Sequence, residues 1–203
     1  MKVLIKTSDE ETFVKLVETT AEFRDLAEFH ISTSKTIDSN YDIGISYMFH
    51  HKVSKEHLQK PWFNFHPAPL PEFKGRNLCY WAIMNEAEEF GATLHYMDEN
   101  YDTGDIIKVR KFDIEPWMTA EDLSDLARAA SYTLLVEYLP RIVKGEQFER
   151  IPNVGGVYYK KSDIDNQITL LEGDERRVRA ITYRKFLPVT NVNGVWYNIM
   201  RAG

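Results

Sequence analysis

Residues 62–75 have the sequence WFNFHPAPLPEFKG, in which an aromatic-rich stretch runs directly into a segment dense in proline. Aromatic and polar side chains alternate over residues 63–66, which predicts a β-strand over residues 62–66. Proline has no amide hydrogen to donate within a sheet, so the prolines of residues 67–71 predict that the chain leaves the sheet there. Alternation also places Asn64 and His66 on the same face, at the carboxyl end of the strand.

Strands and helices alternate on both sides of this stretch. Further strands are predicted at residues 2–6, 42–49, 92–98 and 105–114, the last antiparallel to its predecessor, and helices at residues 13–23, 75–85 and 119–144. The longest helix has Thr119 as its N-cap, Gly145 at its end, and an inward face formed by Leu123, Leu126, Ala127, Ala130, Leu134 and Tyr138. The alternation predicts an α/β fold with a mostly parallel sheet that includes an antiparallel strand.

The composition of the chain changes after Ile151-Pro152. We therefore predict a main domain over residues 1–150 and a small β-rich C-terminal extension over residues 151–203. The extension has a helical pattern near residues 175–183 and a hairpin signal at Asn193-Gly194. Its aromatic strand at residues 195–197 could form a homodimer contact.

Charge and cysteine content limit the classes of partner. The 203 residues include 25 Lys and Arg against 31 Asp and Glu, a net charge of −6. An acidic surface repels polyphosphate, so we expect no nucleic-acid and no membrane partner. The single Cys79 cannot form an internal disulfide, and no apolar run approaches the roughly 20 residues of a membrane span, so a cytoplasmic protein is expected. Adjacent residues of a strand point to opposite faces, so His50 and His51 are poorly placed to bind one metal ion together. We expect them to line a pocket or to face solvent instead.

A second polar segment, residues 98–105 (DENYDTGD), follows another predicted strand. Ligands of such sheets bind beyond the carboxyl ends of the strands, so Asp102 could meet His66 there. An Asn, a His and an Asp suit the attack of an amine on an acyl carbonyl. Asn64 and a protonated His66 would stabilise the oxyanion, and Asp102 would accept the proton of the amine. Taken singly, His66 could be a structural histidine, Asn64 a strand-end cap and Asp102 a turn residue.

The run from Asn64-x-His66-Pro67 to Lys74-Gly75, with Asp102-Thr103-Gly104 downstream, resembles the folate-dependent formyltransferases over roughly residues 42–145. The resemblance implies a Rossmann-like formyltransferase sheet, catalytic roles for Asn64, His66 and Asp102, and 10-formyltetrahydrofolate as formyl donor. The motif falls early in the chain, which implies a shortened N-terminal half. The implied folate-binding residues are Tyr47, Met48, Phe49, His50, Asp98, Asn100 and Tyr101.

Within this family, the sequence is most similar to the nucleotide-sugar N-formyltransferases, which implies an amino-deoxy sugar as acceptor. Residues 6–11 (KTSDEE) have no glycine and three acids, which disfavours the phosphate loop of a glycinamide ribonucleotide enzyme. The acidic chain and its short tail disfavour tRNA. Lys74 and Arg76 could neutralise a diphosphate, and Tyr80 or Trp81 could stack on a base or sugar. The alternatives are formyl transfer to another amine and a non-catalytic relative that binds folate or nucleotides.

Overall fold

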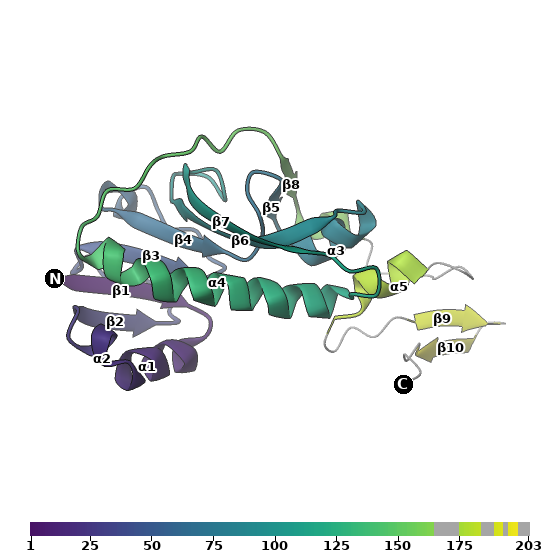
Figure 1. The fold of residues 1–203 in the computed structure, drawn as a ribbon, viewed down its shortest axis with the longest axis horizontal. Coiled ribbons are helices and arrows are strands. Elements are labelled where there is room, and N and C mark those ends of the chain that lie inside the picture. Colours follow the sequence, from purple (N-terminus) through teal and green to yellow (C-terminus); the bar gives the residue numbers. More distant parts are fainter. Residues whose placement is uncertain (165–174, 184–188, 193–194, 199–203) are drawn as a thin grey trace.

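The computed structural model describes residues 1–164, 175–183, 189–192 and 195–198. A six-stranded sheet of order β2-β1-β3-β4-β6-β7 forms its centre (Figure 1). Its strands are β1 Lys2–Thr7, β2 Glu28–Ser32, β3 Ile43–Tyr47, β4 Trp62–His66, β6 Glu89–Tyr96 and β7 Ile106–Asp113. The first four strands of the chain are parallel to one another, whereas β6 runs antiparallel to β4 and β7 antiparallel to β6. The predicted α/β class, with a mixed and mainly parallel sheet, is confirmed.

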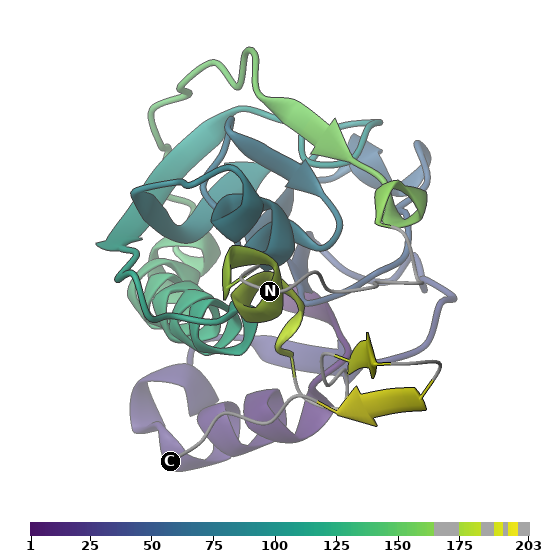
Figure 2. The same cartoon turned by 90° about the vertical axis from the view of Figure 1, so that its right-hand side faces the viewer.

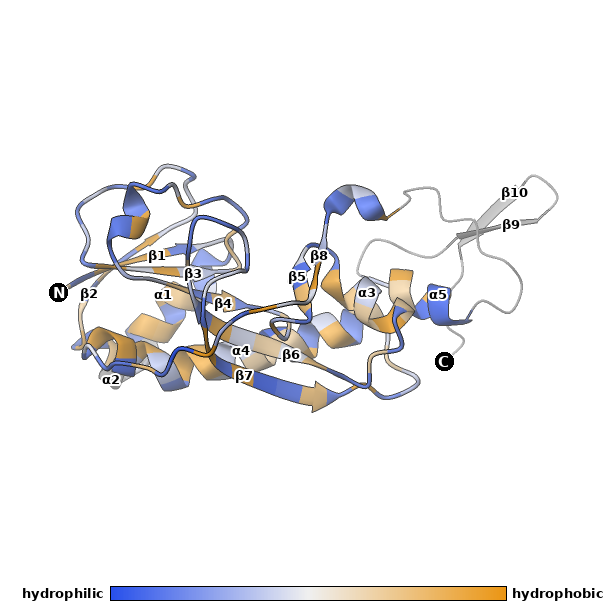
Figure 3. Cartoon of the chain, turned by 90° about the horizontal axis from the view of Figure 1, so that it is seen from above, coloured by the Kyte–Doolittle hydropathy of each residue, from blue (hydrophilic) through white to orange (hydrophobic). Residues whose placement is uncertain are grey.

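Helices cover one face of this sheet. They are α1 Glu10–Thr19, α2 Ala21–Arg24 and α4 Ala120–Val143, and their inward side chains share a core with the apolar positions of β1, β3, β4 and β6. Figure 3 shows hydrophobic positions along α4, while the edge strand β7 is largely hydrophilic. Charged side chains on an edge strand oppose pairing with other chains.

The start of α4 follows the sequence closely. Thr119 accepts a hydrogen bond from the amide of Asp122, whose carboxylate accepts one from the amide of Thr119, so the two residues form a capping box. The prediction that Leu126 faces inward was wrong, because this residue is 39% exposed. Leu123 and Ala127 already occupy the stripe that faces the sheet, and Leu126 lies to one side of it.

A smaller group of elements packs beside the sheet. β5 Phe73–Gly75 pairs in parallel with β8 Val157–Tyr159, and α3 Leu78–Met84 packs against α5 Glu175–Ile181 (Figure 2). Two short 3-10 helices span His57–Gln59 and Lys161–Asp163.

The strands expected around Asn193-Gly194 are present. They are β9 Val189–Val192 and β10 Val195–Asn198, which pair antiparallel, while Asn193 and Gly194 themselves lie outside the described residues. The division at residue 150 and the dimer contact on the aromatic strand stay predictions.

Candidate active site

A row of polar side chains crosses the face of the sheet opposite the helices. Cross-strand pairing places Lys6 beside Ser32 and Ser46, Ser46 beside Asn64, and Asn64 beside His95. Directly opposed residues of neighbouring strands share a face, so these five residues form one continuous row. Lys6 is fully buried, and its ammonium group donates to the hydroxyl of Ser32 at 3.0 Å; burial lowers the pKa of Lys6. The main core lies on the opposite face, and this row lies next to a small apolar cluster of Leu4, Tyr41, Val53 and Trp62.

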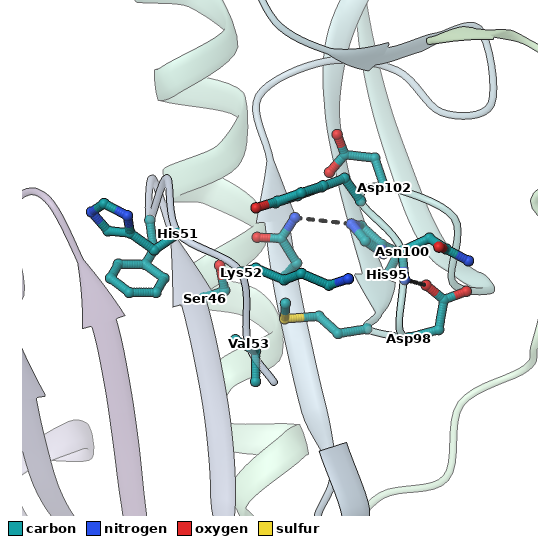
Figure 4. Close-up of a pocket in the computed structure, with 12 residues that line it drawn as sticks. Ser46, His51, Lys52, Val53, His95, Asp98, Asn100 and Asp102 are labelled. Carbon is teal, nitrogen blue, oxygen red and sulfur yellow. Dashed lines mark hydrogen bonds between the residues drawn. The ribbon is translucent and has the colours of Figure 1, made fainter. Parts of the chain in front are cut away.

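A cavity of about 50 Å³ lies over this row. Figure 4 shows its two walls, with His51 and Lys52 on one side and Asp98, Asn100 and Asp102 on the other. The walls belong to the chain that follows β3 and the chain that follows β6, and an exposed ion pair joins them, from Lys55 Nζ to a Glu99 oxygen at 2.6 Å. Pockets for organic ligands usually measure about 300–1,000 Å³, so this cavity encloses only part of such a ligand. The lining residues are Ser46, Phe49, His51, Lys52, Val53, Asn64, His95, Met97, Asp98, Asn100, Tyr101 and Asp102.

His95 determines the orientation of the Asn64 amide. Its Nδ1 lies 2.7 Å from the carbonyl oxygen of Tyr96, so Nδ1 carries the proton and donates it. The other ring nitrogen, Nε2, then accepts a hydrogen bond from Asn64 Nδ2 at 2.9 Å. Burial is the main reason that the pKa of His95 is lowered to about 4, although the Asp102 carboxylate opposes this effect. A neutral His95 therefore accepts one hydrogen of the Asn64 amide and leaves the second available to a ligand.

His66 and Asp102 form the second half of the site. His66 Nδ1 lies 3.4 Å from Asp102 Oδ1, and the two side chains are only 6% and 12% exposed. His66 Nε2 donates to the carbonyl of Phe73 at 3.0 Å, while Asp102 Oδ2 accepts from the amide of Gly75 at 2.9 Å. Because Nε2 carries a proton for Phe73, a hydrogen bond to Asp102 requires a second proton on Nδ1. The structure thus brings Asp102 and His66 together, with the imidazole behind the carboxylate rather than open to the cavity.

The route by which Asp102 reaches this place differs from the expected one. From the sequence, the carboxyl end of β6 was expected to lie beside the carboxyl end of β4. In the structure β6 is antiparallel to β4, so the amide of Met97 bonds to the carbonyl of Trp62 at the opposite end. The loop between β6 and β7 then returns over the polar face and carries Asp102 to His66.

Residues 40–139 match the family model described as formyl transferase. This segment belongs to the formyl transferase family. Among curated relatives, the chain is 35% identical to a GDP-perosamine N-formyltransferase of Brucella melitensis over 143 residues, which cover 67% of this chain and 54% of that protein. It is 33% identical to a methionyl-tRNA formyltransferase of Clostridium novyi over 119 residues, which cover 57% of this chain and 38% of that protein. The chain thus spans about half or less of the length of these two formyltransferases.

Solved structures share the fold over nearly the whole chain. A sugar N-formyltransferase from a Shewanella species superposes with a TM-score of 0.79 at 20% identity, over 100% of this chain and 97% of the other. A formyltransferase from Anoxybacillus kamchatkensis, solved with UDP-4,6-dideoxy-4-formamido-L-AltNAc and tetrahydrofolate, gives a TM-score of 0.68 at 24% identity, over 80% and 87% of the two chains. The first match covers nearly all of both chains, so the two proteins share the fold over their described length.

Four of the seven folate-binding candidates line the cavity of this formyl transferase domain, namely Phe49, Asp98, Asn100 and Tyr101. Three do not. The ring of Tyr47 is buried in the core against Phe13 and Phe65, and burial raises the pKa of Tyr47 to about 12. Met48 and His50 precede and follow Phe49 without lining the cavity. His51, for which pocket lining or solvent exposure was predicted, lines the cavity. The lining residues that were not predicted are Lys52 and Val53, which continue the same loop, together with Ser46, His95 and Met97.

The substrate-binding candidates differ in how far they are exposed. Lys74 is only 7% exposed, and its ammonium group donates to the backbone carbonyl of Gly155 at 2.9 Å, so it faces the protein interior and not a diphosphate. Arg76 is exposed and donates to the carbonyl of His50. Trp81 is half-buried and stacks on Tyr159 with ring centroids 4.8 Å apart.

Tyr80 is half-buried and meets the edge of Trp81, which leaves Arg76 as the exposed cation of the predicted set.

Burial raises the pKa of the Cys79 thiol to about 12, which agrees with a scheme that has no covalent nucleophile. In the described part of the chain, no group of three or more His, Cys, Asp or Glu side chains is arranged to hold a metal ion. None of the helices in those same residues is both long and apolar enough to cross a membrane.

Proposed function

We propose that this protein transfers a formyl group from 10-formyltetrahydrofolate to the amino group of a nucleotide-linked amino-deoxy sugar. The observation that carries the proposal is the Asp102 carboxylate, which is held against His66 and lines the same cavity as the Asn64 amide, within a formyl transferase domain. The 35% identity to a GDP-perosamine N-formyltransferase supports the sugar as acceptor. The solved formyltransferases with bound tetrahydrofolate or folinic acid support the folate donor.

The chemistry requires one proton acceptor and one oxyanion site. The neutral amine attacks the formyl carbon that is bound to N10 of the folate, which gives a tetrahedral intermediate with a negatively charged oxygen. The nitrogen of the amine loses a proton, the bond between the formyl carbon and N10 breaks, and N10 takes up a proton. The products are a formamido sugar and tetrahydrofolate, so no external oxidant or reductant is needed.

Each step has a residue of this chain to perform it. The second amide hydrogen of Asn64 is positioned by His95 to donate to the oxyanion. Asp102 accepts the amine proton, and its ordered carboxylate needs no reorganisation to do so. His66 lies behind Asp102, so we assign it to the stabilisation of that carboxylate. Its Nε2 is bonded to the carbonyl of Phe73, so His66 can donate to the oxyanion only after that carbonyl moves away.

Electrostatics favour a small acceptor over tRNA. The net charge of −6 opposes a polyanion, whereas the exposed guanidinium of Arg76 is a candidate contact for the diphosphate of a sugar nucleotide. The N-terminus of α1 is occupied by the carboxylate of Asp9, which accepts from the amide of Thr12 at 3.2 Å, so a phosphate would be repelled there. Cys79 forms no disulfide, which is usual for proteins of the reducing cytoplasm. We therefore propose that the enzyme acts in the cytoplasm on small molecules.

The test is a product assay by mass spectrometry. Purified protein is incubated with 10-formyltetrahydrofolate and a panel of nucleotide-linked amino sugars, with glycinamide ribonucleotide and methionyl-tRNA as competing acceptors. We expect one amino sugar to gain the mass of a formyl group in a folate-dependent manner. Transfer to glycinamide ribonucleotide or methionyl-tRNA alone would show that the acceptor is not an amino sugar. Folate binding without transfer to any acceptor would identify a non-catalytic relative.

A further inference from the structure

Residues 151–159, which we name the strap, lie beyond the segment matched by the formyl transferase model but run beside the loop that carries Asp102. At the start of the strap, Ile151 forms an antiparallel bridge with Ile106. At its end, β8 pairs with β5. The strap is therefore attached to the sheet on one side of the site and to the chain after His66 on the other.

Asn153 connects the strap to the turn at Asp102. Its side-chain Nδ2 donates to the backbone carbonyls of Asp102 and Gly104, each at 3.0 Å. An amide nitrogen has two hydrogens, and both are used on this one turn. The two contacts fix the positions of the peptide group that follows Asp102 and of the peptide group that follows Gly104.

The buried ammonium group of Lys74 holds the strap from the other side. Lys74 Nζ donates to the carbonyl of Gly155 at 2.9 Å and to that of Asn153 at 3.5 Å. A buried ammonium group must be compensated by acceptors, and these two carbonyls supply them. Lys74 therefore anchors the backbone of Asn153, the residue that contacts the turn.

Gly75 completes the frame around the carboxylate. Its amide donates to Asp102 Oδ2 at 2.9 Å, and its φ of +96° is one that glycine adopts without strain. A Cβ at this position would lie 2.1 Å from the carbonyl oxygen of Tyr159. The close approach of β5 to the strap thus depends on glycine, and it presents the amide to Asp102.

The backbone of Asp102 needs this support. Its φ is +58°, in the left-handed region that residues other than glycine seldom occupy. Such a conformation persists where the surrounding contacts over-determine it, and it is common at functional sites. Here the contacts are the two hydrogen bonds from Asn153 and the one from the amide of Gly75.

We propose that the strap is part of the catalytic unit and that Asn153 is a positioning residue, which holds the Asp102 turn so that the carboxylate can accept a proton. The proposal rests on the proposed function only in giving Asp102 that role. It also moves the domain boundary, because a division at residue 150 would separate Asn153 from the turn that it holds.

A double-mutant cycle tests the proposal. We expect Asn153→Ala to lower kcat by about tenfold or more, since small displacements of a catalytic group are costly, while KM for the folate stays within about twofold. In an Asp102→Asn background the same substitution should change kcat little, because the carboxylate through which Asn153 acts is gone. Equal losses in both backgrounds would overturn the positioning role. Should Asn153→Ala not fold, Asn153→Ser, which keeps a single donor, replaces it with an intermediate loss expected.

Asn85→Ala is the matched control. Asn85 Nδ2 also binds the strap, through the hydroxyl of Tyr159 at 2.8 Å, but it does not contact the Asp102 turn. This variant should retain kcat within about twofold of the wild type. A loss equal to that of Asn153→Ala would show that the strap acts only as a structural support.

A readout that needs no substrate separates this proposal from the proposed function. In NMR spectra, the ring nitrogen signals of His66 should move in Asn153→Ala towards their positions in Asp102→Asn, and should remain in place in Asn85→Ala. Unchanged His66 signals in Asn153→Ala would overturn the proposal even in an active enzyme. If no acceptor is formylated by the wild type, the proposed function fails and the NMR comparison still decides the role of Asn153.

Discussion

His95 is the residue on which the orientation of the Asn64 amide depends. We expect His95→Leu to lower kcat by about tenfold or more, because an amide without its acceptor is no longer aimed at the oxyanion. Folate affinity should change little. His30→Leu, an exposed change on β2, is the control. Steady-state kinetics on folded protein check the prediction, and a kcat equal to that of the control would contradict it.

The low pKa of His95, about 4, predicts that stability falls in mild acid. The unfolded chain takes up a proton near the ordinary histidine value of about 6.5, whereas the folded protein does so only near pH 4, so acid favours unfolding within this window. Between about pH 7.5 and pH 5 the contribution is about 2 kcal/mol. Urea unfolding of wild type and His95→Leu at both pH values measures it. An equal pH dependence in the two proteins would refute the assignment.

The residues of the site were only partly accessible from the sequence. Asn64 and Asp102 could be proposed because their segments combine strand ends with distinctive turn chemistry. His95 was not proposed as a site residue, since a single histidine in a strand carries no sign of its partner across the sheet. Lys74 was assigned to a phosphate because sequence cannot show that an ammonium group turns inward to backbone carbonyls.

At the scale of elements, the cap of α4 offers a clean test. Thr119→Ala removes the hydroxyl that accepts from Asp122 and should lower the free energy of unfolding by about 1 kcal/mol. Thr133→Ala is the control, because Thr133 is an exposed residue in the interior of α4 whose hydroxyl donates to the carbonyl of Ala129. Chemical denaturation of both variants decides the matter. A smaller loss in Thr119→Ala than in Thr133→Ala would contradict the capping role.

The elements with strong periodicity were predicted from the sequence, and the weak ones were not. The helix at 120–143 and the strands β1, β3, β4 and β7 carry patterns that local chemistry determines. Strand β5 was missed because it has only three residues and gains its hydrogen bonds from the distant β8. Strand β2, Glu28–Ser32, was missed although its five residues alternate polar and apolar side chains. The direction of β6 depends on how its loop folds back, which no local pattern encodes.

At the scale of the whole molecule, ligand binding should be visible as stabilisation. A ligand that binds only the folded state at about 100 times its Kd adds about 2.7 kcal/mol, which raises Tm by about 5–10 °C in a chain of this size. We expect this shift with folinic acid as probe, and a smaller or equal one with a nucleoside diphosphate. Thermal unfolding with each ligand measures the effect. No shift with folinic acid at saturating concentration would contradict the folate site.

The central claim is that Asp102 removes a proton from an amine as a formyl group is transferred. The most direct measurement is the single-turnover rate at which an isotopically labelled formyl group passes from 10-formyltetrahydrofolate to an amino-sugar nucleotide, in wild type and in Asp102→Asn. We expect the label to appear in the sugar formamide, and we expect Asp102→Asn to be slower by about a hundredfold with folate binding retained. Equal rates in the two proteins would contradict it.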